Sequence, residues 1–141
     1  MASFLPMSEA TALGLHAATL VAESEIEGHG AVRMTTMADA LKASEAHLSK
    51  VLQTLVRAGL LASKRGPKGG YRLTRPGSTI RLLEVYEACE GGVRSDGCLF
   101  DRPVCERASC ILGGLVERVR SEVVEHLSHT TLAEAAGNLR R

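Results

Sequence analysis

The chain contains no tryptophan, and only 3% of its 141 residues are aromatic. Hydrophobic residues nevertheless make up 45% of the sequence, which is enough for a core. That core must consist mainly of Leu, Val, Ala and Ile side chains, a composition that favours a helical fold. The length suits one domain, or a small domain with an extension.

Long apolar runs and a strong charge of one sign are also missing. No run approaches the ~18 residues of a membrane-spanning helix, and the first residues lack the basic and apolar regions of a signal peptide. We therefore expect a cytoplasmic protein without a membrane partner. The formal net charge of +1 indicates nothing about partners. No Ser/His/Asp set or pair of carboxylates suggests an enzyme.

The sequence is, by contrast, rich in cysteine at one place, since Cys89, Cys98, Cys105 and Cys110 lie in one short segment. In a reducing cytosol, clustered thiols more often bind metal or act in redox chemistry than form structural disulfides. The last three have the spacing C-x6-C-x4-C, and three thiolates suit an iron–sulfur cluster whose fourth ligand is labile or not a cysteine. Zinc usually has a closer pair such as C-x2-C. Zinc and a metal-free disulfide or sulfenate switch stay open as alternatives.

Capping residues and helical periodicity predict the order of the elements. Ser8 and Ser44 suit N-cap positions, Thr36 and Asp39 resemble a capping box, and Gly59 is placed to end a helix. The predicted elements are a helix after Ser8 that ends before a loop at 23–31, helices at 37–42 and 44–59, strands at 60–64 and 70–74, helices from about 79 to 89 and from about 105 to 127, and a short C-terminal turn opened by Thr131 and Glu134.

This order, with only Ala43 and Ser44 between the two inner helices, is typical of a winged helix-turn-helix. We expect a mainly α fold with a DNA-binding domain over residues 1–78, including a small β-hairpin wing, and a cysteine loop and dimerisation region over residues 79–141. The long C-terminal dimerisation helix would measure roughly 34 Å. Its apolar stripe would pair with its copy in a two-fold homodimer, which would bind a near-palindromic operator.

Basic residues are concentrated between Arg33 and Arg75, where the sequence holds nine of them and only two acidic residues. Such a stripe indicates phosphate binding on double-stranded DNA. In this fold the N-terminal part of the second helix enters the major groove. The planar guanidinium of Arg65 suits base or minor-groove contact, whereas Lys50 and Lys68 suit phosphates. The candidate DNA-binding residues on the second helix and the hairpin are His47, Ser49, Lys50, Arg65, Lys68 and Arg72.

Two segments resemble a known family. Residues 47–60 (HLSKVLQTLVRAGL) resemble the recognition helix, and residues 63–73 (SKRGPKGGYRL) the wing, of the Rrf-type bacterial winged helix-turn-helix regulators, the group containing IscR, NsrR, RirA and CymR. The resemblance continues through 84–91, the cysteine loop and 131–134, and so covers nearly the whole chain. It implies a homodimeric transcription factor, and many members hold an iron–sulfur cluster with three loop cysteines.

Carried over to this sequence, the resemblance assigns individual roles. The cluster ligands would be Cys98, Cys105 and Cys110, and the family's DNA contacts fall on Ser44, Ser63 and Arg65. Nitric-oxide-sensing members have a ligating aspartate of the partner subunit near the start of the first helix, where this chain has Ala12. Glu9, His16 and Cys89 are candidates for the fourth ligand, although Cys89 equally suits a core position at a helix end.

The function expected from the sequence is transcription regulation through DNA binding, with operator affinity controlled by a 2Fe-2S or 4Fe-4S cluster that responds to iron, redox state or nitric oxide. One alternative is a cluster-free regulator of the same fold that responds to a thiol or a metabolite. A small iron–sulfur electron carrier is a less favoured alternative, because a carrier has no need of the basic hairpin tip.

Overall fold

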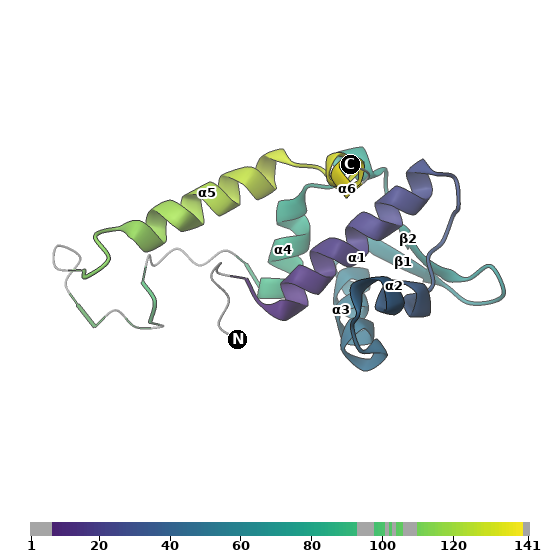
Figure 1. Ribbon diagram of the computed structural model, residues 1–141, viewed down its shortest axis with the longest axis horizontal. Helices are drawn as coiled ribbons and strands as arrows, with labels where there is room; N and C mark the ends of the chain where they lie inside the picture. Colours follow the sequence, from purple (N-terminus) through teal and green to yellow (C-terminus); the bar gives the residue numbers. More distant parts are fainter. Residues whose placement is uncertain (1–6, 93–97, 101, 103, 106–109, 140–141) are drawn as a thin grey trace.

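The structure, a computed structural model, describes residues 7–92, 98–100, 102, 104–105 and 110–139. Within them it is mainly helical with one antiparallel sheet of two strands. The order predicted from the sequence, a winged helix-turn-helix followed by further helices, is confirmed (Figure 1). The elements are α1 (Glu9–Ile26), α2 (Met34–Leu41), α3 (Glu45–Arg57), β1 (Leu61–Lys64), β2 (Gly70–Leu73), the 3-10 turn η1 (Gly77–Thr79), α4 (Leu82–Glu90), α5 (Leu115–His129) and α6 (Leu132–Leu139).

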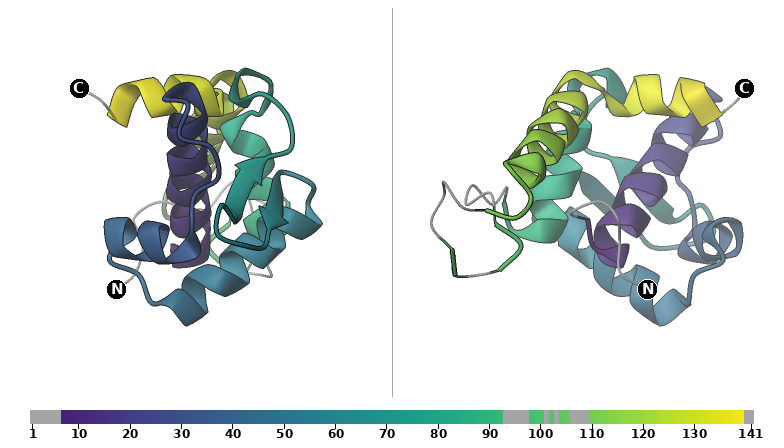
Figure 2. Two further views of the ribbon diagram at one scale, coloured as in Figure 1. Left: turned by 90° about the vertical axis from the view of Figure 1, so that its right-hand side faces the viewer. Right: turned by 60° about the vertical axis from the view of Figure 1, so that its left-hand side comes forward.

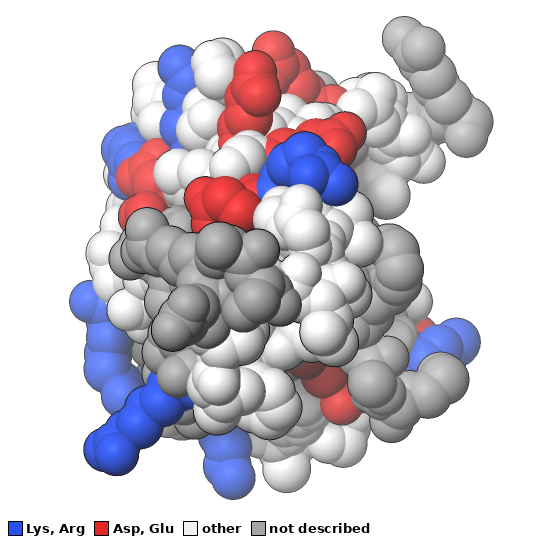
Figure 3. All heavy atoms as spheres, turned by 90° about the vertical axis from the view of Figure 1, so that its left-hand side faces the viewer, with Lys and Arg blue, Asp and Glu red and all other residues white. Residues whose placement is uncertain are grey.

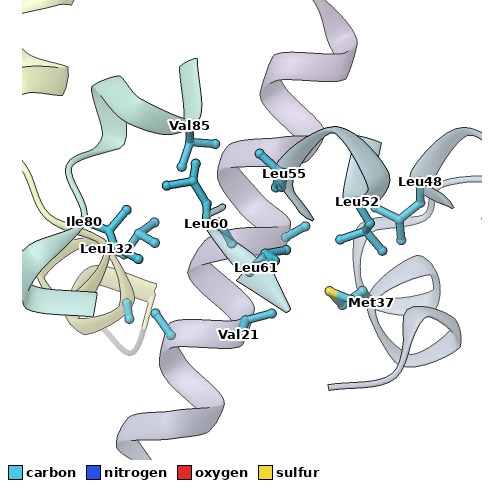
Figure 4. Packing of buried hydrophobic residues seen from close by; sticks show 14 of the residues in the cluster. Val21, Met37, Leu48, Leu52, Leu55, Leu60, Leu61, Ile80, Val85 and Leu132 are labelled. Atoms are coloured by element: carbon cyan, nitrogen blue, oxygen red, sulfur yellow. The ribbon is translucent and has the colours of Figure 1, made fainter. Parts of the chain in front are cut away.

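One hydrophobic core connects the helix-turn-helix to the C-terminal helix α6. Met37 of α2 and Leu48 of α3 lie at one end of this core, and Ile80, Val85 and Leu132 lie at the other (Figure 4). All five side chains are fully buried, and each such burial contributes roughly 2 kcal/mol. Helix α1 packs against α3, α4 and α6 and spans the molecule between α6 and the α2–α3 pair (Figure 2). The domain division at residue 78 stays a prediction, and the core includes residues from both sides of it.

Two predicted helix starts and one predicted capping box are confirmed, although the capping box opens the eight-residue helix α6 and not the short turn that was predicted. The Ser8 hydroxyl accepts a hydrogen bond from the backbone N–H of Thr11, and the Ser44 hydroxyl accepts one from the backbone N–H of His47. At α6, Thr131 and Glu134 form the predicted capping box, with each side chain accepting from the other's backbone N–H. Each such cap is worth about 1 kcal/mol.

Two predicted boundaries near the first turn were wrong. Helix α1 continues to Ile26, into the predicted loop, and the chain turns only near Gly28, whose φ of +76° suits glycine. Helix α2 begins at Met34 rather than Met37, with Arg33 as its N-cap. Thr36 therefore lies inside the helix and opens no capping box.

The helices that flank the cysteine loop also start later than predicted. Helix α4 begins at Leu82, because Gly77–Thr79 form the separate turn η1. Helix α5 begins at Leu115, about ten residues after the predicted start, because Gly113 and Gly114 adopt φ values of +54° and +80° that a right-handed helix excludes. Its 15 residues span about 22 Å instead of the predicted 34 Å.

The wing is attached to the segment before α2. Strands β1 and β2 pair in the register Leu61↔Leu73 to Lys64↔Gly70, and Val32 adds a bridge to Tyr71 through two backbone hydrogen bonds of 3.0 and 2.8 Å. A Cβ atom on Gly70 would lie 2.5 Å from the Val32 carbonyl oxygen. Only glycine therefore allows this approach, and the wing position depends on it.

Candidate functional site

Helix α3 has one buried and one exposed side. Leu48, Val51, Leu52 and Leu55 face the core. On the opposite side of the helix Ala46, Lys50, Gln53 and Arg57 are exposed, because residues three, four or seven apart share a helix face. This exposed row is the surface that a recognition helix would present to a DNA groove.

The predicted residues on α3 differ in exposure. Lys50 lies in the exposed row, and Ser44 is exposed at the helix start. The Ser44 oxygen accepts from the His47 N–H, so its O–H remains a donor. His47 and Ser49 are half-buried at the flanks of the row. Gln53 was not among the predicted DNA-binding residues, although the spacing of the apolar residues already puts it opposite the core.

On the wing, Ser63, Arg65, Lys68 and Arg72 are all exposed. Arg65 and Lys68 lie in the tip between the strands, and the strand register pairs Ser63 with Tyr71. The Arg33 guanidinium donates to the Pro67 carbonyl at 2.5 Å and so connects the tip to the start of α2. Arg72 instead has its guanidinium near Gly30 in the α1–α2 loop, 3.7 Å from where a Cβ on that glycine would lie.

The basic residues are distributed unevenly over the surface. In Figure 3, acidic and basic side chains are mixed over the upper half, whereas most of the charged side chains toward the lower edge are Lys or Arg. Helix α3 lies at this lower edge in Figure 1. The arrangement fits the predicted phosphate-binding stripe.

Cys105 and Cys110 come together in the cysteine loop. The interaction between their side chains acts in opposite directions on the two groups: after desolvation, it helps to raise the pKa of Cys105, and it helps to lower the pKa of Cys110. Backbone N–H groups, with that of Leu112 first and those of Gly114 and Gly113 after it, lower the pKa of Cys110 together with the Cys105 thiol, against the opposing effect of desolvation. Of this pair, Cys110 is therefore the thiol that is more readily deprotonated, as a nucleophile or metal ligand requires.

Cys98 also acts on Cys105. Desolvation, with the charges of Cys110 and Cys98 as further causes, raises the pKa of Cys105, so Cys98 is near enough to act electrostatically. Among the described residues, no three Cys, His, Asp or Glu side chains already form a metal-binding group. Three sulfur donors in one loop nevertheless fit the donor chemistry of an iron–sulfur cluster.

Cys89 is in a different environment. It is half-buried at the end of α4 and packs against the core, and a Cβ on Gly14 of α1 would lie 2.8 Å from its sulfur. Burial, followed by the nearby Glu90 carboxylate, raises its pKa to about 11. A protonated thiol packed on α1 supports a role in the core rather than as a ligand.

The other two candidates for the fourth ligand, Glu9 and His16, lie on α1. Glu9 and His16 are exposed, and the His16 Nδ1 atom bonds the Ala12 carbonyl oxygen at 2.7 Å, which leaves Nε2 available. The start of α1 is attached to the end of α4, because Glu90 Oε1 accepts hydrogen bonds from the Ser8 N–H (2.7 Å) and the buried Thr11 hydroxyl. This contact, which the sequence analysis missed, lies beside Gly91, where the cysteine loop begins.

Comparison with known proteins gives consistent results. The model of the Rrf2 family, described as iron-dependent transcriptional regulators, matches residues 7–138. Over 97 residues the chain is 38% identical to YwgB of Bacillus subtilis, a candidate HTH-type transcriptional regulator, covering 67% of this chain and 60% of YwgB. Over 95 residues it is 35% identical to IscR of Cereibacter sphaeroides, covering 65% and 61%. The solved structure of CymR, the global cysteine regulator of B. subtilis, aligns with a TM-score of 0.76 at 27% identity over 96% of this chain and 98% of CymR.

Proposed function

The chain belongs to the Rrf2 family of transcriptional regulators. From this premise we propose that it is a homodimer, and that an iron–sulfur cluster on Cys98, Cys105 and Cys110 controls its affinity for operator DNA. The observation on which the proposal depends is that Cys98, Cys105 and Cys110 lie in one loop, in which backbone N–H groups favour the Cys110 thiolate. The similarity to an IscR protein supports the same assignment.

In this proposal the DNA interface comprises α3 and the wing. The exposed row of α3 enters the major groove, and the wing tip contacts an adjacent part of the duplex. The free O–H of Ser44 and the ammonium groups of Lys50 and Lys68 bind phosphates, while the guanidinium of Arg65 binds a base edge or the minor groove. The remaining candidates at the interface are His47, Ser49, Ser63 and Arg72.

The dimer forms through α5. This helix contacts α4, and Leu127 is its one fully buried residue among those described. An apolar groove of about 750 Å³ runs along it, with Met7, Val119 and Val123 among its lining residues. We expect α5 of a second copy to cover this groove. The two α3 helices of such a dimer bind half-sites about one DNA turn apart, so the operator is near-palindromic.

The cysteine loop can communicate with α3 through the chain's own contacts. Cys98, Cys105 and Cys110 would hold the cluster as thiolates, and the cluster supplies one-electron redox chemistry and reactivity toward small molecules. The loop begins at Gly91, directly after Glu90, whose carboxylate holds the first turn of α1. Helix α1 in turn packs against α3. A change in the loop therefore has a short path to the DNA interface.

The cysteine assignment is tested by the colour of the anaerobically purified protein and by its iron and sulfide content. We expect a visible absorption band in the wild type, its loss in Cys98→Ala, Cys105→Ala and Cys110→Ala, and its retention in the matched control Cys89→Ala. A colourless, iron-free wild type would contradict the assignment, and so would loss of colour in the Cys89 variant alone.

The Cys105–Cys110 contact also favours a second candidate, a cluster-free thiol switch. The Cys110 thiolate would attack a peroxide, taking one oxygen as a sulfenate and releasing water or an alcohol. The Cys105 thiolate would then attack the sulfenic sulfur, forming a disulfide and releasing hydroxide. The similarity to CymR agrees with this alternative. Cys98→Ala separates the two candidates, because it removes a cluster ligand but leaves both partners of the disulfide.

A further inference from the structure

Resting on the DNA-binding part of the proposed function, we infer that Gln53 is a specificity-determining residue that selects an adenine at one position of each operator half-site. Gln53 is exposed and lies on the side of α3 opposite the buried Leu48 and Leu55. It comes two turns after Ala46 and one turn before Arg57, so the three residues lie in line along the exposed row.

The Gln53 amide is available for a ligand. Among the residues that the structure describes, no hydrogen-bond partner contacts this side chain. Two neighbouring polar side chains already make hydrogen bonds within the helix. The Thr54 hydroxyl donates to the Lys50 carbonyl at 3.1 Å, and the Ser44 oxygen caps the helix start. Gln53 thus combines central exposure with an amide free to make paired hydrogen bonds.

The chemistry of that amide matches one base. A glutamine oxygen accepts from the adenine N6 amino group while its nitrogen donates to adenine N7, and no other base offers this pair of groups in the major groove. Lys50 and Arg57, on either side of Gln53 in the row, are pure donors that suit phosphates or guanine. The Ala46 methyl group, in line with Gln53, suits contact with a thymine methyl group. Discrimination of adenine at this surface therefore depends on Gln53.

The test is selection of binding sites from a random duplex library by the full-length, anaerobically purified protein at one salt concentration. The wild type should select an A·T pair at a symmetric position in both half-sites. Gln53→Ala should lose this preference by roughly 5- to 150-fold at that position alone, and Gln53→Glu should shift it toward cytosine, whose amino group donates to a carboxylate. The control Lys68→Ala should weaken all sites about equally and reduce the salt dependence.

Thermal unfolding would show that the variants fold, as expected for an exposed side chain. If the wild type selects a sequence and Gln53→Ala keeps the same preference at every position, the inference is overturned while the proposed function stands. If the wild type enriches no sequence, both are overturned.

Discussion

At the scale of single residues, the immediate environment sets the acidity of Cys89 and Cys110. The N–H groups of Leu112, Gly114 and Gly113 favour the thiolate of Cys110, whereas burial keeps Cys89 protonated with a pKa of about 11. Both are cysteines of one short segment, so neither composition nor clustering distinguishes them. The difference arises because one lies before a helix start and the other packs on α1.

A second residue-scale feature is Lys42, in the turn between α2 and α3. It has φ +53° and ψ +37° and is the one non-glycine residue with positive φ among those described. A side chain in this conformation costs roughly 1–2 kcal/mol, and asparagine tolerates it better.

We therefore predict that Lys42→Asn raises the free energy of unfolding by about 0.5–1 kcal/mol, measured from the urea midpoint. Lys42→Ala is the matched control, because it removes the same charge but keeps a strained Cβ, and it should change stability little. Equal stability of the Asn and Ala variants would show that the backbone of this turn is not strained.

At the scale of elements, the contact between α1 and α4 depends on Glu90. Its carboxylate accepts from the Ser8 N–H and the Thr11 hydroxyl. Although burial acts to raise its pKa, hydrogen bonds from Thr11 and Ser8 oppose this, and the net pKa is lowered. A carboxylate with a lowered pKa in the folded state binds protons more weakly there than when unfolded, so its ionised form stabilises the fold.

We predict that Glu90→Gln lowers the free energy of unfolding at pH 7 by about 1 kcal/mol, since the charge-assisted hydrogen bonds weaken and the site is partly exposed. The difference from wild type should be complete above the ordinary Glu pKa of about 4.3 and should disappear as the pH falls through the lower folded-state pKa. Urea unfolding across this range measures it. The control is Glu87→Gln, an exposed position on the same helix. If the loss of unfolding free energy in Glu90→Gln did not change with pH, the electrostatic account would be refuted.

The elements also show what the sequence could predict. The spacing of Leu48, Leu52 and Leu55 predicted both α3 and its buried side, because helical periodicity is a local property. The start of α5 was misplaced because the apolar stripe continues from Ile111 to Leu115 across Gly113 and Gly114, a glycine pair that the helix does not include. The hydrogen bond between Ser8 and Glu90 joins residues 82 positions apart. The interaction between the Cys105 and Cys110 thiols depends on the conformation of the loop. Local sequence patterns therefore predicted neither.

At the scale of the whole molecule, helix α1 lies between the predicted DNA-binding elements and the helices that flank the cysteine loop. The wing and α3 lie on one side of α1, while α4 and α5 lie on the other (Figure 1). Helix α5 leaves an apolar groove uncovered in one chain, and Glu90 connects the start of the cysteine loop to α1. A second copy on α5 would place two cysteine loops and two α3 helices in one two-fold assembly, so the state of the loops would affect both half-sites together.

Control of DNA binding by the cysteine loop is tested most directly by comparing operator affinity before and after removal of iron from the same anaerobic preparation. Operator DNA obtained by selection is titrated at one salt concentration, with the absorption spectrum recording cluster loss. A coupling of 1–3 kcal/mol between two sites corresponds to a change of roughly 5- to 150-fold, and we predict a difference in dissociation constant within that range. Equal affinities of the two forms, with cluster loss verified, would contradict control of DNA binding by the cysteine loop.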